Sequence, residues 1–463
     1  MVRVKYLIVG AGPTGLAAGW RLRELGEESF LILEKNAHVG GLAASFTDPA
    51  GFTWDIGGHV VFSHFPYFDR LLDELLAGEY LEHQRQAFIR TAGTWVPYPF
   101  QNNIRHLPRG LTWECVAGLL PTNRHRFDRP GAEEFVPADF REWIDYVFGE
   151  GIAKTFMYPY NFKVWATPPE RMSAKWIGER VSVVSLERVL KNIILGLDDV
   201  SFGPNNVFKF PLFGGTGEIF RRLAARIEGK IATSQVAASI DPAAKTLATE
   251  SGERFTFDTL LFTGPLDLLA AKIIRGAPDA VREAAGRLEH NGALIAGVGI
   301  AGHKPDPKCW MYFPEDNCPF YRVTNFHNYS PNNAPKPLAG AAGHRALMTE
   351  VSVSGHKPED KASHLTRVID GLVACGLLEA GERQSVVSRW ETAVEYAYPI
   401  PTLHRDAALG VIQPWLEAHG VFGRGRFGGF KYEVGNMDHS VMQGVEWAQR
   451  MIAGTPETVY TLS

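Results

Sequence analysis

The fold is decided by the stretch Tyr6-Leu7-Ile8-Val9-Gly10-Ala11-Gly12-Pro13-Thr14-Gly15. Residues 6–9 are a short apolar run that predicts a buried strand, and the G-x-G-x-x-G pattern after it predicts a sharp turn into a helix over residues 16–25. A second apolar run, residues 30–33, ends in Glu34, which lies 34 − 15 = 19 positions after Gly15. Because about 20 positions are typical of a dinucleotide-binding βαβ unit, the chain is predicted to begin with one.

The residue types of this unit suit a pyrophosphate. Gly10, Gly12 and Gly15 allow a sharp turn and a close backbone approach, and the helix that starts near Pro13 and Thr14 offers free N–H groups and a partial positive charge. Glu34 can accept hydrogen bonds from the two ribose hydroxyls. The alternative is a tight packing turn with no ligand, but strand, turn, helix, strand and acid occurring in order favour the dinucleotide site.

A second glycine pair, Gly40-Gly41, follows Glu34 by six residues and suits a loop that folds back over the bound dinucleotide. An acid followed by paired glycines resembles the large family of FAD proteins that includes the amine oxidases. That resemblance implies FAD as the cofactor and adds Lys35, Gly40, Gly41 and Leu42 to its expected contacts.

The bulk composition excludes several other classes. The 463 residues are 45% apolar and 21% charged, as in globular proteins of two or three domains, and a net charge of −4 gives no sign of a nucleic-acid partner. No apolar run approaches the ~18 residues that a membrane span needs. The first strand starts too close to Met1 for a signal peptide, so we expect a cytoplasmic protein. Four cysteines without zinc-site spacing predict free thiols: Cys115, Cys309, Cys318 and Cys375.

Three later motifs point to ligand contacts. Gly57-Gly58-His59 predicts a backbone close to a flat group, for which the isoalloxazine ring is a candidate. The segment 95–103 is dense in aromatic and amide side chains and fits either a ligand wall or a packed loop. A glycine-rich turn before a helix expected at residues 441–452 would place a helix N-terminus on the flavin, with contacts at Gly435, Asn436, Met437 and Ser440.

Nearly the whole chain, from about residue 5 to 455, resembles the UDP-galactopyranose mutase family, and its eukaryotic (fungal-like) branch in particular. The most specific segments are Gly57-Gly58-His59-Val60-Val61-Phe62-Ser63-His64, residues 96–103, Pro159-Tyr160-Asn161-Phe162-Lys163-Val164-Trp165, residues 312–322 and residues 424–428.

The resemblance implies an isomerase that interconverts UDP-galactopyranose and UDP-galactofuranose without net redox change. In this family the N5 atom of reduced FAD acts as the nucleophile on the anomeric carbon, and UDP is the leaving group. The eukaryotic branch takes electrons from NADPH directly, and the resemblance implies the same here, although no separate NADPH motif is present. Met437 stands where the fungal pattern carries Gln beside the flavin.

The resemblance also implies site residues. Arg180 and Arg322 are expected to grip the diphosphate, His59 to respond to the flavin redox state, and Arg426 to lie beside the flavin. Tyr98 and Phe156 are expected to sandwich the uracil, with Gln101 at its edge. The remaining expected substrate contacts are Phe62, His64, Asn161, Trp165, Asn205, Tyr312, Tyr329, Tyr398 and Tyr432.

The predicted architecture is α/β: a Rossmann-like FAD-binding domain with an inserted helical domain and an antiparallel β-sheet domain. We expect the FAD-binding domain to comprise residues 1–70, 201–265 and 411–463, the helical substrate domain 71–200 and the sheet domain 266–410. Three alternatives remain. They are the same chemistry on another NDP-sugar, an amine oxidase-like oxidoreductase that shares the N-terminal motifs, and an inactive flavoprotein that binds nucleotide sugars.

Overall fold

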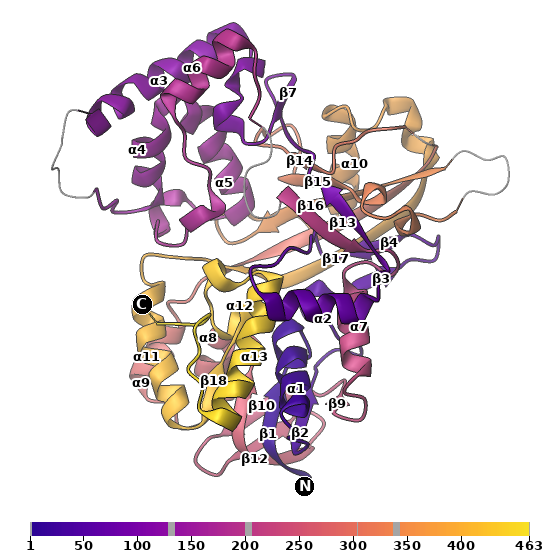
Figure 1. Ribbon diagram of the computed structural model, residues 1–463, viewed down its shortest axis with the longest axis vertical. Coiled ribbons are helices and arrows are strands. Elements are labelled where there is room, and N and C mark those ends of the chain that lie inside the picture. Colours follow the sequence, from indigo (N-terminus) through magenta and orange to yellow (C-terminus); the bar gives the residue numbers. More distant parts are fainter. Residues whose placement is uncertain (1, 128–134, 200–205, 303, 337–342, 463) are drawn as a thin grey trace.

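The computed structural model describes residues 2–127, 135–199, 206–302, 304–336 and 343–462. Figure 1 shows a lower part built around β1 and α1, a central sheet that contains β13 and β16, and a lobe formed by α3, α4, α5 and α6. The fold is mixed α/β, as the sequence predicts.

The lower part is built on a seven-stranded sheet in the order β10-β11-β12-β1-β2-β9, with β18 also paired to β12. β1 pairs in parallel with β2 and β12, and its side chains from Tyr6 onward alternate between two buried clusters, Tyr6 and Ile8 in one, Leu7 and Val9 in the other. Burial of both faces explains the continuous apolar run. The strands are β1 (Val2–Val9), β2 (Phe30–Leu33), β9 (Ile231–Ala232), β10 (Ala237–Asp241), β11 (Thr246–Thr249), β12 (Arg254–Phe262) and β18 (Val421–Gly423).

Helices cover both faces of this sheet. One face packs against α1 (Pro13–Glu24), α2 (Pro66–Leu76), α7 (Gly217–Ala225) and α13 (Met437–Ala453). The other packs against α8 (Leu266–Leu268), α9 (Asp279–Ala285), α11 (Arg405–Ala418) and α12 (Gly425–Gly428). On the first face α1 and α13 touch backbone to backbone, because a Cβ on Gly444 would lie 2.1 Å from Thr14 O.

The central sheet has the order β17-β13-β16-β15-β14-β6-β7, antiparallel except for the parallel pair β14–β6. Gly297 in β13 gives room to the Trp54 ring, since a Cβ there would lie 2.4 Å from it. α10 (His364–Ala374) packs on the opposite face. The strands are β6 (Ala87–Thr91), β7 (Thr94–Pro97), β13 (His290–Ala301), β14 (Trp310–Tyr312), β15 (Arg322–Asn325), β16 (His344–Val353) and β17 (Val386–Pro399).

The helical lobe contains α3 (Arg109–Phe127), α4 (Phe140–Ile152), a π-helical turn at Ala153–Met157, α5 (Tyr158–Trp165) and α6 (Leu186–Leu195). Asp139 caps α4 by accepting the Glu142 N–H at 2.9 Å. Two ribbons complete the fold, β3 (Ser45–Thr47) with β4 (Thr53–Asp55), and β5 (Tyr80–Gln84) with β8 (Val207–Pro211).

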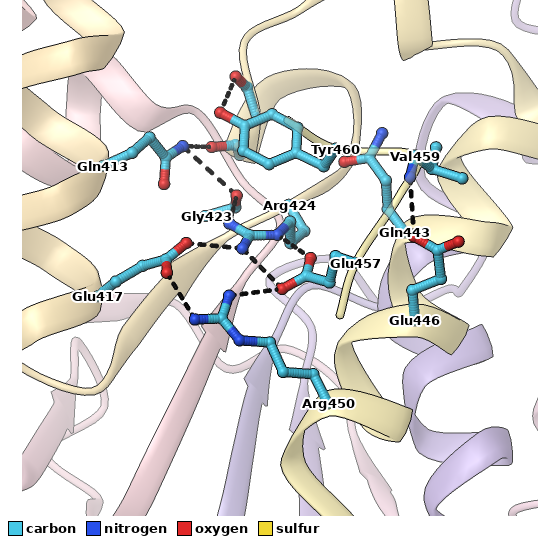
Figure 2. Close-up of polar contacts among 12 residues, drawn as sticks. Gln413, Glu417, Gly423, Arg424, Gln443, Glu446, Arg450, Glu457, Val459 and Tyr460 are labelled. Atoms are coloured by element: carbon cyan, nitrogen blue, oxygen red, sulfur yellow. Dashed lines mark hydrogen bonds and ion pairs between the residues drawn. The ribbon is translucent and has the colours of Figure 1, made fainter. Parts of the chain in front are cut away.

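The C-terminal tail is fixed by a buried ionic network (Figure 2). Arg424, 2% exposed, donates Nη2 to Glu417 at 2.7 Å and to Glu457 at 2.8 Å. Arg450 donates Nη1 to Glu457 at 2.9 Å, and the Tyr460 hydroxyl donates to Gly429 O at 2.9 Å. The tail is thereby fastened to α11, α12 and α13.

Several element boundaries differ from those predicted. The last helix starts at Met437, earlier than the expected 441, because the Asn436 N-cap already begins it. β17 (Val386–Pro399), whose side chains alternate between more buried and exposed positions, was not predicted from the sequence. All four cysteines are free, as predicted. Among the described helices none has both the length and the apolar character of a membrane span.

Candidate active site

A cavity of about 360 Å³ is lined by residues of the helical lobe, the central sheet and the lower part. It brings together most of the predicted site residues from very different parts of the chain. Those that line it are Leu42, Gly57, Gly58, His59, Phe62, His64, Tyr98, Phe156, Asn161, Trp165, Arg180, Tyr312, Arg322, Tyr398, Arg426, Tyr432, Asn436 and Met437.

Arg322, at the start of β15, is one of two expected phosphate-binding arginines. Its Nε and Nη2 donate to the two carboxylate oxygens of Glu350, on the neighbouring β16, at 2.6 and 2.7 Å. Its guanidinium also lies over the Trp310 ring, 5.1 Å from the centroid. Nη1 makes no hydrogen bond within the described part of the chain, so this is the nitrogen left for an anionic ligand.

Glu350 is the buried anion of the site. Oε1 also accepts the Gly58 N–H at 2.9 Å, and Oε2 accepts the Tyr321 hydroxyl at 2.8 Å. Burial alone would raise the pKa of Glu350, but the Arg322 charge and these hydrogen bonds hold it below its usual value. Glu350 is therefore a carboxylate, and Arg322 enters the cavity with its charge partly compensated.

Arg180 comes from the short helical turn Gly178–Arg180 in the helical lobe. Its guanidinium lies over the Tyr432 ring at 5.7 Å, and its Nη2 donates to the backbone carbonyl of Glu433. Arg180 therefore has no carboxylate partner among the residues described. It offers the cavity a full positive charge on a half-buried side chain.

Aromatic rings form two walls of the cavity. In the first, Phe156 stacks on Tyr160 at 5.0 Å, and the Tyr312 ring contacts Tyr160 at 5.4 Å and Tyr98 at 5.9 Å. In the second, Trp165 contacts Tyr398 at 6.0 Å and Tyr432 at 4.7 Å. Burial raises the pKa of Tyr98, Tyr312 and Tyr432, so their hydroxyls stay protonated.

The hydroxyls of Tyr312, Tyr398 and Tyr432 make no hydrogen bond to any part of the chain described in the structure. Phenol donors without an internal partner suit an anionic ligand, because each can donate to a phosphate oxygen. Together with Arg180 and Arg322 they give the cavity positive charge and hydrogen-bond donors that suit an anionic ligand.

His59 follows the paired glycines, and the turn depends on Gly57, whose φ is +92°. Its Nδ1 is buried without a partner in the described chain. Burial, reinforced by the charges of Arg426 and Arg322, lowers its pKa to about 4. The imidazole is therefore neutral at pH 7 and keeps one nitrogen available to accept a hydrogen bond.

His64 lines the cavity and is fixed by Asp438 at the start of α13. Its Nδ1 lies 2.7 Å from Asp438 Oδ2, and Asp438 Oδ1 lies 3.0 Å from Nδ1 of His439. Burial alone would raise the pKa of Asp438, but these two histidines lower it. The carboxylate thus orients both imidazoles.

The N-terminal unit has the shape that a dinucleotide requires. Gly10 has φ +105°, and a Cβ on Gly15 would lie 1.9 Å from Gly10 O. The start of α1 therefore lies so close to the end of β1 that only glycine fits at these positions. A Cβ on Gly12 would meet only Gly41 Cα, at 3.9 Å, which leaves open space over the start of α1. Pro13 begins that helix, Thr14 is buried in its first turn, and no side chain caps it.

Glu34 is buried at the end of β2, with the exposed Lys35 next to it. Its Oε2 accepts the Ala11 N–H at 2.7 Å, and its Oε1 accepts the Asn36 side chain at 2.8 Å. Oε1 also accepts the Asn36 N–H at 2.9 Å, so three of the roughly four lone-pair positions of the carboxylate are occupied and one remains for a ribose hydroxyl. Gly40 donates its N–H to Ala11 O at 2.8 Å, so the second glycine pair does fold back over the first turn.

The family model described as flavin containing amine oxidoreductase matches residues 13–452. The crystal structure of a reduced UDP-galactopyranose mutase superposes with a TM-score of 0.93 at 40% identity, over 99% of this chain and 97% of that one. The chain belongs to the UDP-galactopyranose mutase family.

More distant structures share the fold alone. A protein from Exiguobacterium assigned as a protoporphyrinogen oxidase has a TM-score of 0.71 at 18% identity, over 98% of this chain and 99% of that one. Putrescine oxidase bound to putrescine has a TM-score of 0.64 at 17% identity, over 98% and 99%. The mutase family therefore sits on the architecture of the flavin-dependent amine oxidases, and the dinucleotide cradle described above fits its FAD.

The structure does not bring every predicted residue to the mutase cavity. Gln101 is 3% exposed and donates to the Ser182 carbonyl, so its amide ties two segments of the helical lobe together. Tyr329 is fully buried in an aromatic cluster with Phe208 and Phe210. Gly435 accepts a hydrogen bond from Arg426, and Ser440 is buried beside it in α13. Asn205 lies outside the described residues.

Several cavity residues were missed by the sequence reasoning, among them Arg85, Trp310, Tyr321 and Glu350. Trp310 and Glu350 belong to strands of the central sheet, Tyr321 immediately precedes β15, and Arg85 lies over the Tyr98 ring at 5.0 Å. Strand residues of this kind look like ordinary core in a sequence. The one available signal was Glu350 itself, because a carboxylate in a run of apolar strand residues predicts a buried cationic partner.

Proposed function

We propose that this protein interconverts UDP-galactopyranose and UDP-galactofuranose with FAD as its cofactor. The observation that carries the proposal is that Arg180 and Arg322 line one cavity together with three tyrosines whose hydroxyls have no hydrogen-bond partner among the described residues. The 40% identity to a UDP-galactopyranose mutase supports the same assignment. Reduced FAD would supply the nucleophile, its N5 atom, for the anomeric carbon.

Arg180 and Arg322 hold the diphosphate while it is detached from the sugar. Arg322 can donate to the diphosphate from Nη1, because its Nε and Nη2 already donate to Glu350. Arg180 can donate from the guanidinium nitrogens other than Nη2, which bonds the Glu433 carbonyl. Charge-assisted bonds of this kind act most strongly as negative charge develops on the leaving group. Tyr312, Tyr398 and Tyr432 add neutral donors around the same phosphates.

The Phe156 and Tyr98 wall is the proposed uracil site, with Asn161 and Trp165 as further nucleotide contacts. Because Asn161 Nδ2 donates to Met157 O at 2.7 Å, its side-chain oxygen is the atom free to meet a base. Gln101 is too deep to make the expected edge contact without giving up its bond to Ser182. We therefore propose Asn161, and not Gln101, as the amide that reads the nucleotide.

His59 stands on the flavin side, between Arg426 and the Glu350–Arg322 pair. As a neutral imidazole with a buried, unpaired Nδ1 it can accept a proton or a hydrogen bond from the ring or the sugar. His64 and Phe62 are proposed to border the sugar. We propose NADPH as the reductant of the flavin. The remaining FAD contacts that the sequence predicts are proposed to bind the cofactor.

A second candidate keeps this chemistry but uses another NDP-sugar. It remains open because the sugar end of the cavity is formed by His59, His64 and Phe62, and few contacts decide between hexoses. An amine oxidase is disfavoured, because its substrates have no diphosphate to occupy two arginines.

The test uses the purified, FAD-loaded protein with UDP-galactofuranose, with and without dithionite, and products are separated by chromatography. Conversion to UDP-galactopyranose only with dithionite supports the proposal. Turnover of a different nucleotide sugar, with UDP-galactofuranose inert, would favour the second candidate. Hydrogen peroxide formed from an amine would favour an oxidase. Replacing dithionite by NADPH tests the reductant.

A further inference from the structure

A pair of cysteines lies outside the cavity, in the core between the central sheet and α10. Cys318 is in the loop between β14 and β15, and Cys375 is the C-cap of α10. Both are buried in the same apolar cluster. Gly371 lets them approach, because a Cβ there would lie 2.9 Å from Cys318 Cβ, and Cys375 follows one helical turn later.

The two thiols are in contact. Their side chains share a hydrogen bond, and Cys375 Sγ also lies 3.7 Å from Asn317 Oδ1, so it faces the loop that carries Cys318. A disulfide joins two Cβ atoms that lie about 3.5–4.5 Å apart. Thiols that already share a hydrogen bond can reach this arrangement by side-chain rotation and a small movement of the loop.

A buried cation completes the cluster. Nζ of Lys163 donates to Glu315 O at 2.8 Å and to Cys318 O at 2.9 Å, and it lies 3.6 Å from Cys318 Sγ. Lys163 forms no ion pair with a carboxylate in the described part of the chain, and a buried ammonium without an anion is costly. As a thiol, Cys318 would donate to Phe320 O at 3.5 Å; as a thiolate, it neutralises Lys163.

The electrostatics divide the pair into two roles. The hydrogen bond from Cys375 and the charge of Lys163 lower the pKa of Cys318, although burial opposes them. The same hydrogen bond, together with burial, raises the pKa of Cys375, which stays a protonated donor. Because the thiolate is the form that reacts with peroxides, Cys318 is the sulfur prepared to attack.

We propose that Cys318 and Cys375 are a thiol pair that hydrogen peroxide oxidises to a disulfide. The Cys318 thiolate attacks one peroxide oxygen: an S–O bond forms, the O–O bond breaks, and the second oxygen leaves as hydroxide and takes up the proton that Cys318 had released. Cys375 then attacks the Cys318 sulfur, the S–O bond breaks, and the Cys375 proton leaves with the hydroxyl as water. Two thiols and one peroxide thus give one disulfide and two waters.

The disulfide changes the contact between the helical lobe and the central sheet. An S–S bond of about 2.05 Å draws the Cys318 sulfur toward α10 and away from Lys163, which then lacks its anion. Since Lys163 holds α5 to the loop between β14 and β15, oxidation loosens this attachment. The inference does not depend on the reaction proposed above.

The chain supplies its own control in the other two cysteines. Cys309 is 6% exposed, against 5% for Cys318, so access alone would oxidise both equally. Its thiol donates to Gln86 O at 3.2 Å, and that of Cys115 lies 4.0 Å from Thr155 Oγ1. Burial raises the pKa of Cys309 and raises that of Cys115 to about 11, so both stay thiols.

The experiment treats the native, FAD-loaded protein with hydrogen peroxide, stops the reaction with catalase, and unfolds the protein in N-ethylmaleimide. Peptides are then analysed by mass spectrometry without a reductant. We expect a disulfide peptide that joins Cys318 to Cys375, formed at least about tenfold faster than any oxidation of Cys115 or Cys309, and removed by dithiothreitol. Cys309→Ser should form the same link at the same rate.

Cys375→Ser separates the two roles, because Cys318 then has no partner and should retain oxygen instead. If that variant does not fold, the wild-type rates decide alone. Absence of the linked peptide, oxidation of Cys309 as fast as that of Cys318, or a Cys318 product that retains oxygen while Cys375 stays free in the wild type would each overturn the inference. An unmodified Cys318 in folded Cys375→Ser would do the same. No turnover is measured, so failure of the proposed function would appear separately, as absent conversion of UDP-galactofuranose.

Discussion

At the scale of single residues, Arg322 and Arg180 differ in how they carry their charge. Arg322 shares its fork with Glu350, whereas Arg180 has only a carbonyl partner and a tyrosine ring. Replacing Arg180 by Ala should lower kcat about 10²- to 10³-fold with FAD still bound, because a donor to the leaving group is lost. Steady-state assays with UDP-galactofuranose measure kcat, and the flavin absorbance shows whether FAD is still bound.

Arg322→Lys should show a loss of similar size, because an ammonium cannot satisfy two carboxylate oxygens and a phosphate together. Arg188→Ala is the control: that side chain is 62% exposed in α6 and pairs with Asp199. It should leave kcat within twofold. Near-normal turnover in Arg180→Ala or Arg322→Lys would contradict the assignment of the leaving-group site.

The pKa of His59 makes a prediction about pH. Folding lowers it from 6.5 to about 4, so between these values the unfolded chain binds a proton that the folded chain does not. Stability therefore falls as pH drops from 6.5 toward 4, by about 3 kcal/mol at most from this residue. His59→Gln should lack this contribution, so the variant should gain stability relative to the wild type as pH falls.

Urea unfolding at pH 7, 6 and 5 measures this difference. Asp55, whose pKa burial raises to about 6, titrates in the same range but is present in both proteins, so its contribution cancels. A difference between the two proteins that does not change with pH would show that His59 is not desolvated.

The limit of sequence reasoning is also visible at this scale. Arg180, Arg322 and His59 could be named because short motifs surround them, and the cavity does contain all three. Gln101 belongs to an equally recognisable segment, whereas Tyr329 lies outside the segments that carry the resemblance, and the side chains of both are packed in the interior. A motif identifies the segment that borders a site, whereas tertiary packing decides which of its side chains face it.

At the scale of elements, α1 and α13 pack backbone to backbone in the flavin part. Gly444→Ala would place a Cβ 2.1 Å from Thr14 O and 2.9 Å from Ala18 N, both backbone atoms that cannot rotate away. The helices must separate, which typically costs about 1–3 kcal/mol and shifts the turn that faces the pyrophosphate. We expect a lower melting temperature and at least tenfold weaker FAD binding.

Gly410→Ala provides the control for this substitution. Gly410 lies inside α11, where a Cβ would meet nothing within 4 Å. The change should stabilise the protein by up to about 1 kcal/mol, since alanine is the better helix former. Equal behaviour of the two variants in thermal melts and FAD titrations would mean that the helices can separate at no cost.

Elements were predicted well where one local rule governs them. The opening strand, turn and helix follow from periodicity and glycine spacing, and the structure has them at β1 and α1. β17 was missed because its exposed face carries Arg389, Glu391 and Glu395, its other face is only half-buried, and its pairing with β13 is long-range. The parallel pairing of β14 with β6 likewise has no local signal.

At the scale of the whole molecule, Lys163 joins the helical lobe to the central sheet. Its Nζ in α5 donates to Glu315 O at 2.8 Å and Cys318 O at 2.9 Å, both in the loop between β14 and β15. Lys163→Met leaves two carbonyls without their donor, at about 1–3 kcal/mol each. We expect a melting temperature several degrees lower and a raised KM for UDP-galactofuranose, because α5 and Arg322 lose their shared anchor.

Lys154→Met tests whether this effect is specific. Lys154 is 68% exposed and makes only a surface pair with Glu150, so its loss should cost less than about 1 kcal/mol. Differential scanning calorimetry gives the melting temperature of both variants, and initial rates with UDP-galactofuranose give their KM. A Lys163→Met protein that melts like Lys154→Met would show that the lobe and the sheet are held together by other contacts.

The order of the strands in the lower sheet has a consequence for biosynthesis. β1 can pair early with β2, but it meets β12 only about 250 residues later, and α1 meets α13 only about 420 residues later. On the ribosome one edge of the first apolar strand and the packed face of α1 therefore stay uncovered until these later elements have emerged. A nascent chain of this design depends on chaperones for longer than one whose segments fold in the order of their synthesis, and low yields on overexpression should respond to slower translation or to added holdases.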